Sequence, residues 1–456
     1  MPLPTFYNRS LRLSAVLALF ACAHAAAQSD GAQTLERQSD EAFRQVLQQP
    51  QNLSLWSSYS QLLIRQGNYE GGIAALERLL LEPDASPSLR VDLGVLYYRL
   101  ASYSMSEVML RKALEDNRLP DDHRALANAL LVDIAKRSQL SQLSGVFTFG
   151  LRHQSNPMYR TDSSQVLAGG VPVPYTQSRE SNSDVNLGVR LRHFYDLEKQ
   201  NSAGIQSSFG AYLTNYSSSA GSEVVANPVK PYDLVVLDLS TGLQFKPLPA
   251  DVSGLTIRPH VLWSNVLAQG KQYFDTYGLG LDASWIVSER TFVDATVDSQ
   301  RRTFASRIDV PDAGLLSGRM DSLRARWTHE LAPGQVVSAD YTARRNRTGR
   351  NYYDSDSHEV QLTYAVSYAS PVLGGGSWTT SVYGSALRRT YGGADPSVSA
   401  AITRRDSESR LGITQRIPVT PVWSLLFALE EARNNANIAN FNYKNTTLSG
   451  TIVRSF

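Results

Sequence analysis

The feature that most constrains this chain is an alternation of apolar and polar residues that begins near Leu143 and continues to the last residues. In "DVNLGVRLRHF", residues 184–194, one parity carries Val185, Leu187, Val189 and Leu191, and the other carries Asn186, Gly188, Arg190 and Arg192. "EVQLTYAVSY" and "TYGLGLDASWIV" alternate in the same way. Because successive side chains of a strand point to opposite faces, each run predicts a β-strand with one apolar and one polar face.

These runs predict fourteen strands. They lie near residues 143–154, 183–196, 203–217, 233–246, 253–266, 274–287, 290–303, 319–331, 335–347, 357–369, 375–388, 407–418, 421–434 and 443–456. Long polar segments at 155–182, 218–232, 304–318 and 389–406 are interleaved with tight turns such as "EKQN", "SER", "APG" and "PVTP". Outer-membrane barrels combine long external loops with short periplasmic turns. We therefore predict an antiparallel transmembrane β-barrel over residues 141–456.

A soluble β-sandwich is the alternative, because its strands also alternate. Strands of twelve or more residues, the asymmetry of the loops and the tryptophans on the apolar parity favour the barrel, in which aromatic residues form belts at the membrane interfaces. Those tryptophans are Trp263, Trp285, Trp327, Trp378 and Trp423. The chain has no apolar run of about 18 residues that would form a membrane-spanning helix, but a barrel spans on strands whose hydropathy signal is weak.

The N-terminus carries a secretory signal. Arg9 and Arg12 precede the apolar stretch "LSAVLALFACAHAAA", which ends in small residues, so we predict a signal peptide over residues 1–27 that is cut near Gln28. The single cysteine, Cys22, lies inside it. In the alternative, "LFAC" is a lipoprotein signal and Cys22 becomes a lipidated N-terminus, although Phe20 is bulky where such signals prefer small residues. If Cys22 is removed with the signal, the mature chain has no thiol.

Residues 28–140 predict helical repeats. Tyr69 and Tyr103 stand 34 residues apart, which is the tetratricopeptide period. Residues near consensus positions are Trp56, Gly72, Pro83, Leu93, Gly94, Tyr97, Ser106, Ala113 and Leu114. Stacked hairpins of this kind form a curved surface that suits a peptide or protein, whereas Tyr97, Tyr103 and Leu110 are interpreted as repeat core. Both ends of an even-stranded barrel lie on one side, so we expect this domain in the periplasm.

The polar parity of the strands predicts the lining of the lumen. The lumen-facing candidates are Arg190, Arg192, Arg258, Arg324, Arg326, Asp238, Asp282 and Glu359. The same parity carries Arg344, Arg410, Arg416, Asp294, Asp298, Asp340 and Glu430. We expect these charges to form ion pairs that cross the lumen and stiffen the barrel. The alternative is a selective pathway for an anionic solute, such as an acidic polysaccharide.

The sequence gives little support for catalysis. It contains no G-x-S-x-G, H-E-x-x-H or glycine-rich phosphate loop. In the barrel region only His260 clearly has lumen parity, while His193 and His329 have the apolar parity. We expect no enzymatic activity, no cofactor and no metal. The net charge of +2 gives no indication of nucleic-acid binding.

The two ends of the barrel region carry local motifs. The stretch "LSGTIVRSF" alternates into the final Phe456 and resembles the last strand of bacterial outer-membrane barrels, where it is the signal for the assembly machinery. "RHQSNPMY", with Ser155-Asn156, and "EARNNANIANFNYKNTTLSGTIVRSF" resemble the opening strand and the closing hairpin of the Slam family, the surface lipoprotein assembly modulators with a DUF560 barrel. Arg454 departs from the apolar or aromatic residue usual at that position.

The resemblance to the Slam family extends to the predicted architecture of the mature chain. It implies an outer-membrane helper that moves secreted proteins or lipoproteins to the cell surface. The repeats would receive cargo, the barrel would give passage, and the partners would be that cargo, outer-membrane lipids and the barrel-assembly machinery. An exopolysaccharide-export porin with periplasmic repeats is the alternative, and a surface receptor or adhesin is a third possibility.

Overall fold

The computed structural model describes residues 35–456, except for residues 138, 178, 200, 221–229, 249–251, 253, 308–310 and 373–375. Contacts between residues divide the chain into two compact units between Gln139 and Leu140. The expected signal peptide, Cys22 and the cleavage near Gln28 lie outside the described residues.

The described part of the first unit, here called the helical unit, consists of six helices. They are a helix over residues 35–48, α2 (Leu53–Arg65), α3 (Tyr69–Leu80), α4 (Pro87–Arg99), α5 (Tyr103–Leu114) and α6 (Asp121–Arg137). The side chains of Asn52, Asn68 and Ser86 each accept a hydrogen bond from a backbone N–H in the first turn of the following helix. None of the helices in the described ranges is long and apolar enough to cross a membrane.

The helices pack as successive hairpins, α2 with α3 and α4 with α5. Two small residues allow α4 and α5 to approach closely: Ser106 Oγ donates to the carbonyl of Gly94 at 2.6 Å, and the side chain of Leu110 occupies the space beside the Cα of Gly94. Leu93 and Leu110 are fully buried in the resulting core. The starts of α3 and α5 are 34 residues apart, as expected. The assignment to the tetratricopeptide class stays a prediction.

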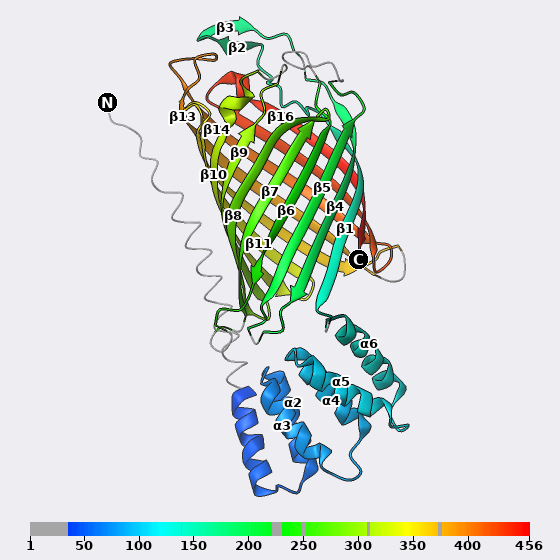
Figure 1. The fold of residues 1–456 in the computed structure, drawn as a ribbon. Helices are drawn as coiled ribbons and strands as arrows, with labels where there is room; N and C mark the ends of the chain where they lie inside the picture. Colours follow the sequence, from blue (N-terminus) through cyan, green and yellow to red (C-terminus); the bar gives the residue numbers. More distant parts are fainter. Residues whose placement is uncertain are drawn as a thin grey trace, which may run out of the picture. The chain divides into compact units, whose positions relative to one another are not determined.

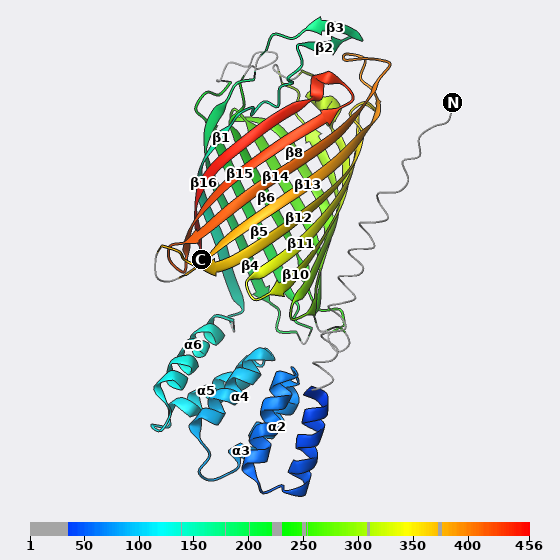
Figure 2. The ribbon, with the colours of Figure 1, turned by 180° about the vertical axis from the view of Figure 1, so that it is seen from behind.

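The second unit, within the described residues, is a closed barrel of fourteen antiparallel strands, which run obliquely around it (Figures 1 and 2). They are β1 (Ser141–Gln154), β4 (Asn182–Asp196), β5 (Gly204–Tyr216), β6 (Leu234–Gln244), β7 (Leu255–Ala268), β8 (Lys271–Ser288), β9 (Thr291–Phe304), β10 (Gly318–Ala332), β11 (Gln335–Thr348), β12 (Ser355–Ala369), β13 (Ser377–Ala394), β14 (Thr403–Pro418), β15 (Trp423–Ala436) and β16 (Tyr443–Ser455). Each strand pairs with the next barrel strand along the chain, and β16 pairs with β1. The predicted strand number and antiparallel pairing are confirmed.

Several connections differ from the prediction. Strand β13 continues to Ala394, so the loop expected from residue 389 begins six residues later. The expected loop 155–182 contains a small hairpin of β2 (Gln165–Ala168) and β3 (Val171–Pro174). The 3-10 helices η1 (Pro311–Leu316) and η2 (Ala439–Phe441) lie in two further connections.

The contrast between long loops and tight turns also has exceptions. We call the end of the barrel where β1 begins the turn end, and the end where β1 finishes the loop end. At the loop end, β7 and β8 are joined only by Gln269 and Gly270, whose φ angles of 53° and 70° suit a tight hairpin turn. At the turn end, β6 and β7 are joined by the longer segment 245–254.

The outer wall of the barrel is apolar. Leu279, Leu411 and Leu448 are 66%, 64% and 58% exposed, and they share their parity with the other large exposed apolar residues of their strands, except Ile286 beside the register shift near the end of β8. Trp263, Trp285, Trp327 and Trp423 are exposed on the same outer face. The side chains between these positions point into the lumen, since parity alternates along a strand.

The barrel closes where β1 meets β16. Gly145 and Phe456 exchange both backbone hydrogen bonds, at 2.9 and 3.0 Å. The ring of Phe456 covers the outer side of Gly145, in space that a Cβ would need. Arg454 also points outward, and its guanidinium lies 5.5 Å from the ring centre of Trp423. A cation–π contact thus accommodates the basic residue that departs from the expected alternation.

Candidate functional site

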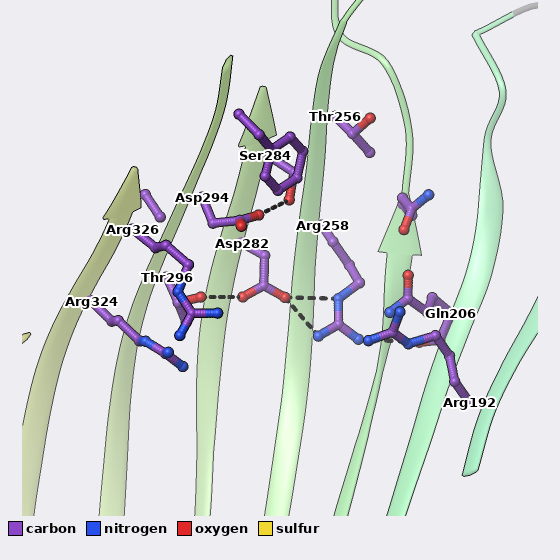
Figure 3. Close-up of a pocket in the computed structure, with 13 residues that line it drawn as sticks. Arg192, Gln206, Thr256, Arg258, Asp282, Ser284, Asp294, Thr296, Arg324 and Arg326 are labelled. Atoms are coloured by element: carbon purple, nitrogen blue, oxygen red, sulfur yellow. Dashed lines mark hydrogen bonds and ion pairs between the residues drawn. The ribbon is translucent and has the colours of Figure 1, made fainter. Parts of the chain in front are cut away.

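The lumen wall near the turn end forms a polar cavity of about 540 Å³, which we call the turn-end cavity (Figure 3). Strands β4 to β10 supply its wall. Five of the eight residues expected to face the lumen line this one cavity: Arg192, Arg258, Asp282, Arg324 and Arg326. The structure therefore brings together residues that are up to 134 positions apart in the sequence.

Asp282 on β8 occupies the centre of the cavity wall (Figure 3). Its Oδ2 accepts hydrogen bonds from Arg258 Nε at 2.9 Å and Nη2 at 2.6 Å, and its Oδ1 accepts one from Thr296 Oγ1 at 2.8 Å (Figure 3). The ring of His260, the one histidine expected in the lumen, lies with Nδ1 3.4 Å from the same carboxylate. Both oxygens of Asp282 are thus engaged by neighbouring strands, which holds Arg258 in a fixed orientation.

The two flanks of the cavity, on β10 and β4, carry positive charge with less compensation (Figure 3). Arg324 and Arg326 on β10 share a single carboxylate oxygen, Asp340 Oδ1, at 3.0 and 2.7 Å. Arg192 on β4 is exposed and has no hydrogen-bond or ion-pair partner within the described part of the chain. Asp294, the other acid at the cavity, accepts from Ser284 Oγ at 2.8 Å (Figure 3). The cavity is therefore suited to attract carboxylates or phosphates.

The remaining three candidates lie elsewhere on the lumen face. Arg190 is exposed next to Arg192 on the same face of β4. Asp238 lines a second cavity of about 550 Å³, nearer the loop end, together with apolar side chains such as Leu234 and Val236. Glu359 contacts Arg344 at 3.5 Å. Parity identifies the face of a residue, but only the register of the strands shows which residues share a cavity.

The expectation that ion pairs cross the lumen is wrong for the pairs described. Arg258 and Asp282 join β7 to β8, and both arginines on Asp340 join β10 to β11. Arg152 and Asp184, at 2.7 Å, join β1 to β4. These pairs brace adjacent strands because a barrel of this strand number is wide compared with the reach of two side chains.

A second polar cluster, at the loop end, was not predicted as a site. Asn156 is fully buried, and its side-chain amide donates to the carbonyls of Arg160 at 2.8 Å and Lys444 at 3.1 Å. Its backbone N–H donates to Asn445 Oδ1 at 2.9 Å. The motifs "RHQSNPMY" and "NYKNTT" therefore contact each other across the closure of the barrel. In the sequence, the only indication of this contact is the asparagines that both motifs contain.

The same loop segment is fixed to the barrel by an aromatic contact. The ring of Tyr159 lies 4.8 Å from that of Tyr443, whose hydroxyl donates to Glu408 Oε2 at 2.9 Å. Tyr159 has a positive φ of 52°, an uncommon conformation for a residue with a side chain. The buried bonds of Asn156 hold this turn in place.

Comparison with known proteins gives no assignment. No family model matches the chain, and no curated protein sequence matches it. Similar solved structures include OccAB3 of Acinetobacter baumannii, with 9% identity over 69% of this chain and 99% of that chain at a TM-score of 0.33. The CymD monoaromatic hydrocarbon channel has 12% identity over 71% and 90% at 0.34, and a bacterial polysaccharide outer membrane secretin has 11% over 69% and 98% at 0.33. Such scores carry no argument about this chain, and the resemblance to the Slam family stays a prediction.

Proposed function

We propose that this protein is an outer-membrane translocator that delivers secreted proteins or lipoproteins to the cell surface. The observation that carries the proposal is one closed barrel with an apolar outer wall and a charged lumen, encoded in the same chain as stacked helical hairpins. In this proposal the helical unit receives cargo in the periplasm and the barrel gives it passage. No enzymatic activity and no cofactor are part of the proposal.

The outer wall supports the membrane placement. A closed barrel satisfies its backbone hydrogen bonds between strands, which is a requirement for a β-structure in a lipid bilayer. Exposed leucines in the middle of strands, such as Leu279 and Leu411, are costly in water and favourable in lipid. We expect the purified protein to need detergent and to migrate differently on gels before and after boiling. Free solubility without detergent and identical migration would contradict the membrane placement.

Export of an anionic polysaccharide is a second candidate function, and the turn-end cavity favours it. Four arginines and two aspartates line that cavity, and Arg192 has no partner among the described residues. An anionic polymer that moves through the lumen would be attracted by this excess of positive charge.

Deletion of the gene separates the two candidates. Intact cells are treated with protease, and the released surface peptides are compared with those of the parent strain by mass spectrometry, while surface polysaccharide is measured in parallel. The translocator proposal expects specific proteins to lose protease sensitivity and to return on complementation. Unchanged surface proteins together with reduced surface polysaccharide would favour the export porin over the translocator. No change in surface proteins or in surface polysaccharide would reject both candidate functions.

The variant Arg324→Ala/Arg326→Ala refines this test. Complementation with it removes two charges of the turn-end cavity, and Arg405→Ala/Arg433→Ala on the outer face removes the same number elsewhere. Reduced delivery with the first variant alone would support passage of the transported molecule along the cavity. If the cavity variant delivers as much cargo to the surface as the outer-face variant does, the cavity is excluded from the path of the transported molecule.

A further inference from the structure

The outer wall at the loop end carries a row of arginines on three adjacent strands. In the strand register, Arg319 of β10 stands opposite Arg301 of β9 on one side and opposite Arg347 of β11 on the other. All three point outward, since each shares parity with an exposed residue of its own strand: Arg301 with Val297, Arg319 with Leu323 and Arg347 with Tyr341. Like charges placed directly opposite one another destabilise a sheet. A bound anion would therefore stabilise this row of arginines.

More basic residues extend the row. Arg345 of β11 lies two residues before Arg347 on the same face, and Arg388 of β13 stands opposite His358 of β12. We call Arg301, Arg319, Arg345, Arg347 and Arg388 the outer arginine patch.

Acidic neighbours neutralise the patch only in part. Arg319 contacts Asp321 at 2.8 Å, while Arg345 and Arg347 share Asp356 at 3.5 and 3.0 Å. Arg301 and Arg388 are exposed and have no ion-pair or hydrogen-bond partner within the described ranges. The patch therefore keeps positive charge on the outer wall of the barrel.

An apolar groove adjoins the patch. It has a volume of about 740 Å³ and is lined by Leu279, Val297 and Leu323 together with Arg319 and Arg345. Along each strand the arginines stand nearer the loop end and the apolar residues nearer the middle. A single ligand that fits both parts has an anionic head and an apolar tail aligned with the strands.

The other rim of the outer wall lacks this chemistry in its described residues. Near the turn end the same face carries Trp285, Trp327 and Trp423, and its arginine, Arg454, lies against the Trp423 ring. Tryptophan is typical of a membrane interface without a requirement for charge. The loop end of the outer wall thus suits anionic lipid headgroups, whereas the turn end has no such preference for charge.

We propose that the outer arginine patch binds the phosphorylated headgroups of lipids in the leaflet at the loop end, with their acyl chains against Leu279, Val297 and Leu323. This inference rests on the membrane placement in the proposed function. Guanidinium groups suit phosphate because they donate two parallel hydrogen bonds to it. The adjoining apolar groove selects a lipid over a free anion.

The experiment compares two double variants in which no carboxylate loses a partner. Arg301→Gln/Arg388→Gln removes the two patch arginines without a partner. Arg405→Gln/Arg433→Gln removes two arginines on the outer face of β14 and β15 that also have none. Each full-length protein is placed in nanodiscs of phosphatidylcholine with a small fraction of lipid A, a bis-phosphorylated glycolipid, and the retained lipid A is counted by native mass spectrometry.

We expect the patch variant to lower the affinity for lipid A about tenfold, because its two residues belong to five arginines gathered beside one apolar groove, where their attractions to one anionic headgroup add. Arg405 and Arg433 lie at the same end of the outer face but on β14 and β15, which do not line that groove. The control variant should change it less than about twofold. Equal losses in both variants, or none in either, would overturn the proposal, as would complete displacement of lipid A by inorganic phosphate.

The outcome is distinguishable from a failure of the proposed function. Migration on gels before and after boiling confirms that each variant is folded. Failure of the unmodified protein to enter nanodiscs would overturn the membrane placement and this inference together. Unchanged surface proteins after gene deletion would reject the translocator and leave the lipid measurement to decide on the patch.

Discussion

The helical unit buries its large apolar side chains in its interior, whereas the barrel exposes them on its outer wall. In the helical unit Leu93 and Leu110 are fully buried, whereas in the barrel Leu279 and Leu411 are among the most exposed large apolar residues. The charged residues are arranged in reverse, since the ion pair of Asp116 and Arg118 lies on the surface of the helical unit and that of Arg258 and Asp282 faces the lumen. In the proposed membrane placement, one chain folds against two different surroundings, with water outside one unit and inside the other.

The difference teaches where each unit obtains its stability. The helical unit is stabilised by removal of apolar area from water, which is proportional to the area buried. The two clusters of buried apolar side chains among the described residues both lie in the helical unit. In the proposed membrane placement the barrel depends instead on closed backbone pairing and on an apolar environment around its outer wall. Substitutions of the same residue type should thus have different effects in the two units.

The largest expected effect is in the core of the helical unit. Leu110→Ala leaves a cavity between α4 and α5 and should destabilise the unit by about 2–5 kcal/mol. The measurement is the urea unfolding of the full-length protein in micelles, followed by the circular dichroism of the helices. Leu81→Ala is the control, because Leu81 is 77% exposed and should change stability by less than about 0.5 kcal/mol.

A charged residue introduced on the outer wall tests whether the exposed apolar face of the barrel contacts lipid. Leu411 lies in the middle of β14, so Leu411→Arg in lipid vesicles should destabilise the barrel by about 2–4 kcal/mol. Leu81→Arg in the helical unit, which is as exposed, should have little effect. Equal stability of the Leu411→Arg protein would mean that the outer wall contacts water, and the comparison between the units would fail.

An ion pair of the lumen should have a smaller effect. Asp282→Ala leaves Arg258 without its carboxylate, and we expect a loss of about 1–3 kcal/mol because lumen water replaces part of the interaction. Asp238→Ala is the control, since Asp238 is exposed and has no partner within the described residues. A double-mutant cycle with Arg258→Ala isolates the coupling between the two groups. Zero coupling would show that the pair adds nothing to the wall.

The smallest expected effect concerns the exposed ion pair of the helical unit. The hydrogen bond from the Arg118 side chain lowers the pKa of Asp116 from 3.8 to about 2. The stabilisation is thus complete above the ordinary carboxyl pKa and is lost as the pH falls through about 2. Titration of the Asp116 carboxyl carbon by NMR should show this value, and Arg118→Ala should raise it. An unchanged pKa in that variant would contradict the assigned cause.

The number and order of the barrel strands followed from the sequence because alternation persists through each strand. The run from residue 143 corresponds to β1, which begins at Ser141, and that from residue 335 corresponds to β11. The extension of β13 through Gly392 and Gly393 could not be predicted, because adjacent glycines also indicate turns. Pro172 and Pro174 similarly concealed β3, a short strand outside the barrel.

The sites were less predictable than the strands. Parity placed Arg192 and Arg258 on one face, but the turn-end cavity depends on a register that is set by all the strands between them. The outer arginine patch was missed because Arg301 and Arg347 interrupt the apolar parity only near strand ends. The opposition of Arg301 and Arg319 becomes visible once β9 and β10 are aligned.

The pairing of β1 with β16 sets the order of events in biogenesis. Asn445 donates to Gln154 from 291 positions away in the sequence, so the first and last barrel strands meet only after the whole unit has been synthesised. Until then the edge of β1 is a free template for other strands, which is a hazard for aggregation. Such distant contacts also slow folding, because the chain loses the entropy of loop closure before the contacts contribute favourable free energy. The nascent chain must therefore be kept apart from its copies until its final strand arrives.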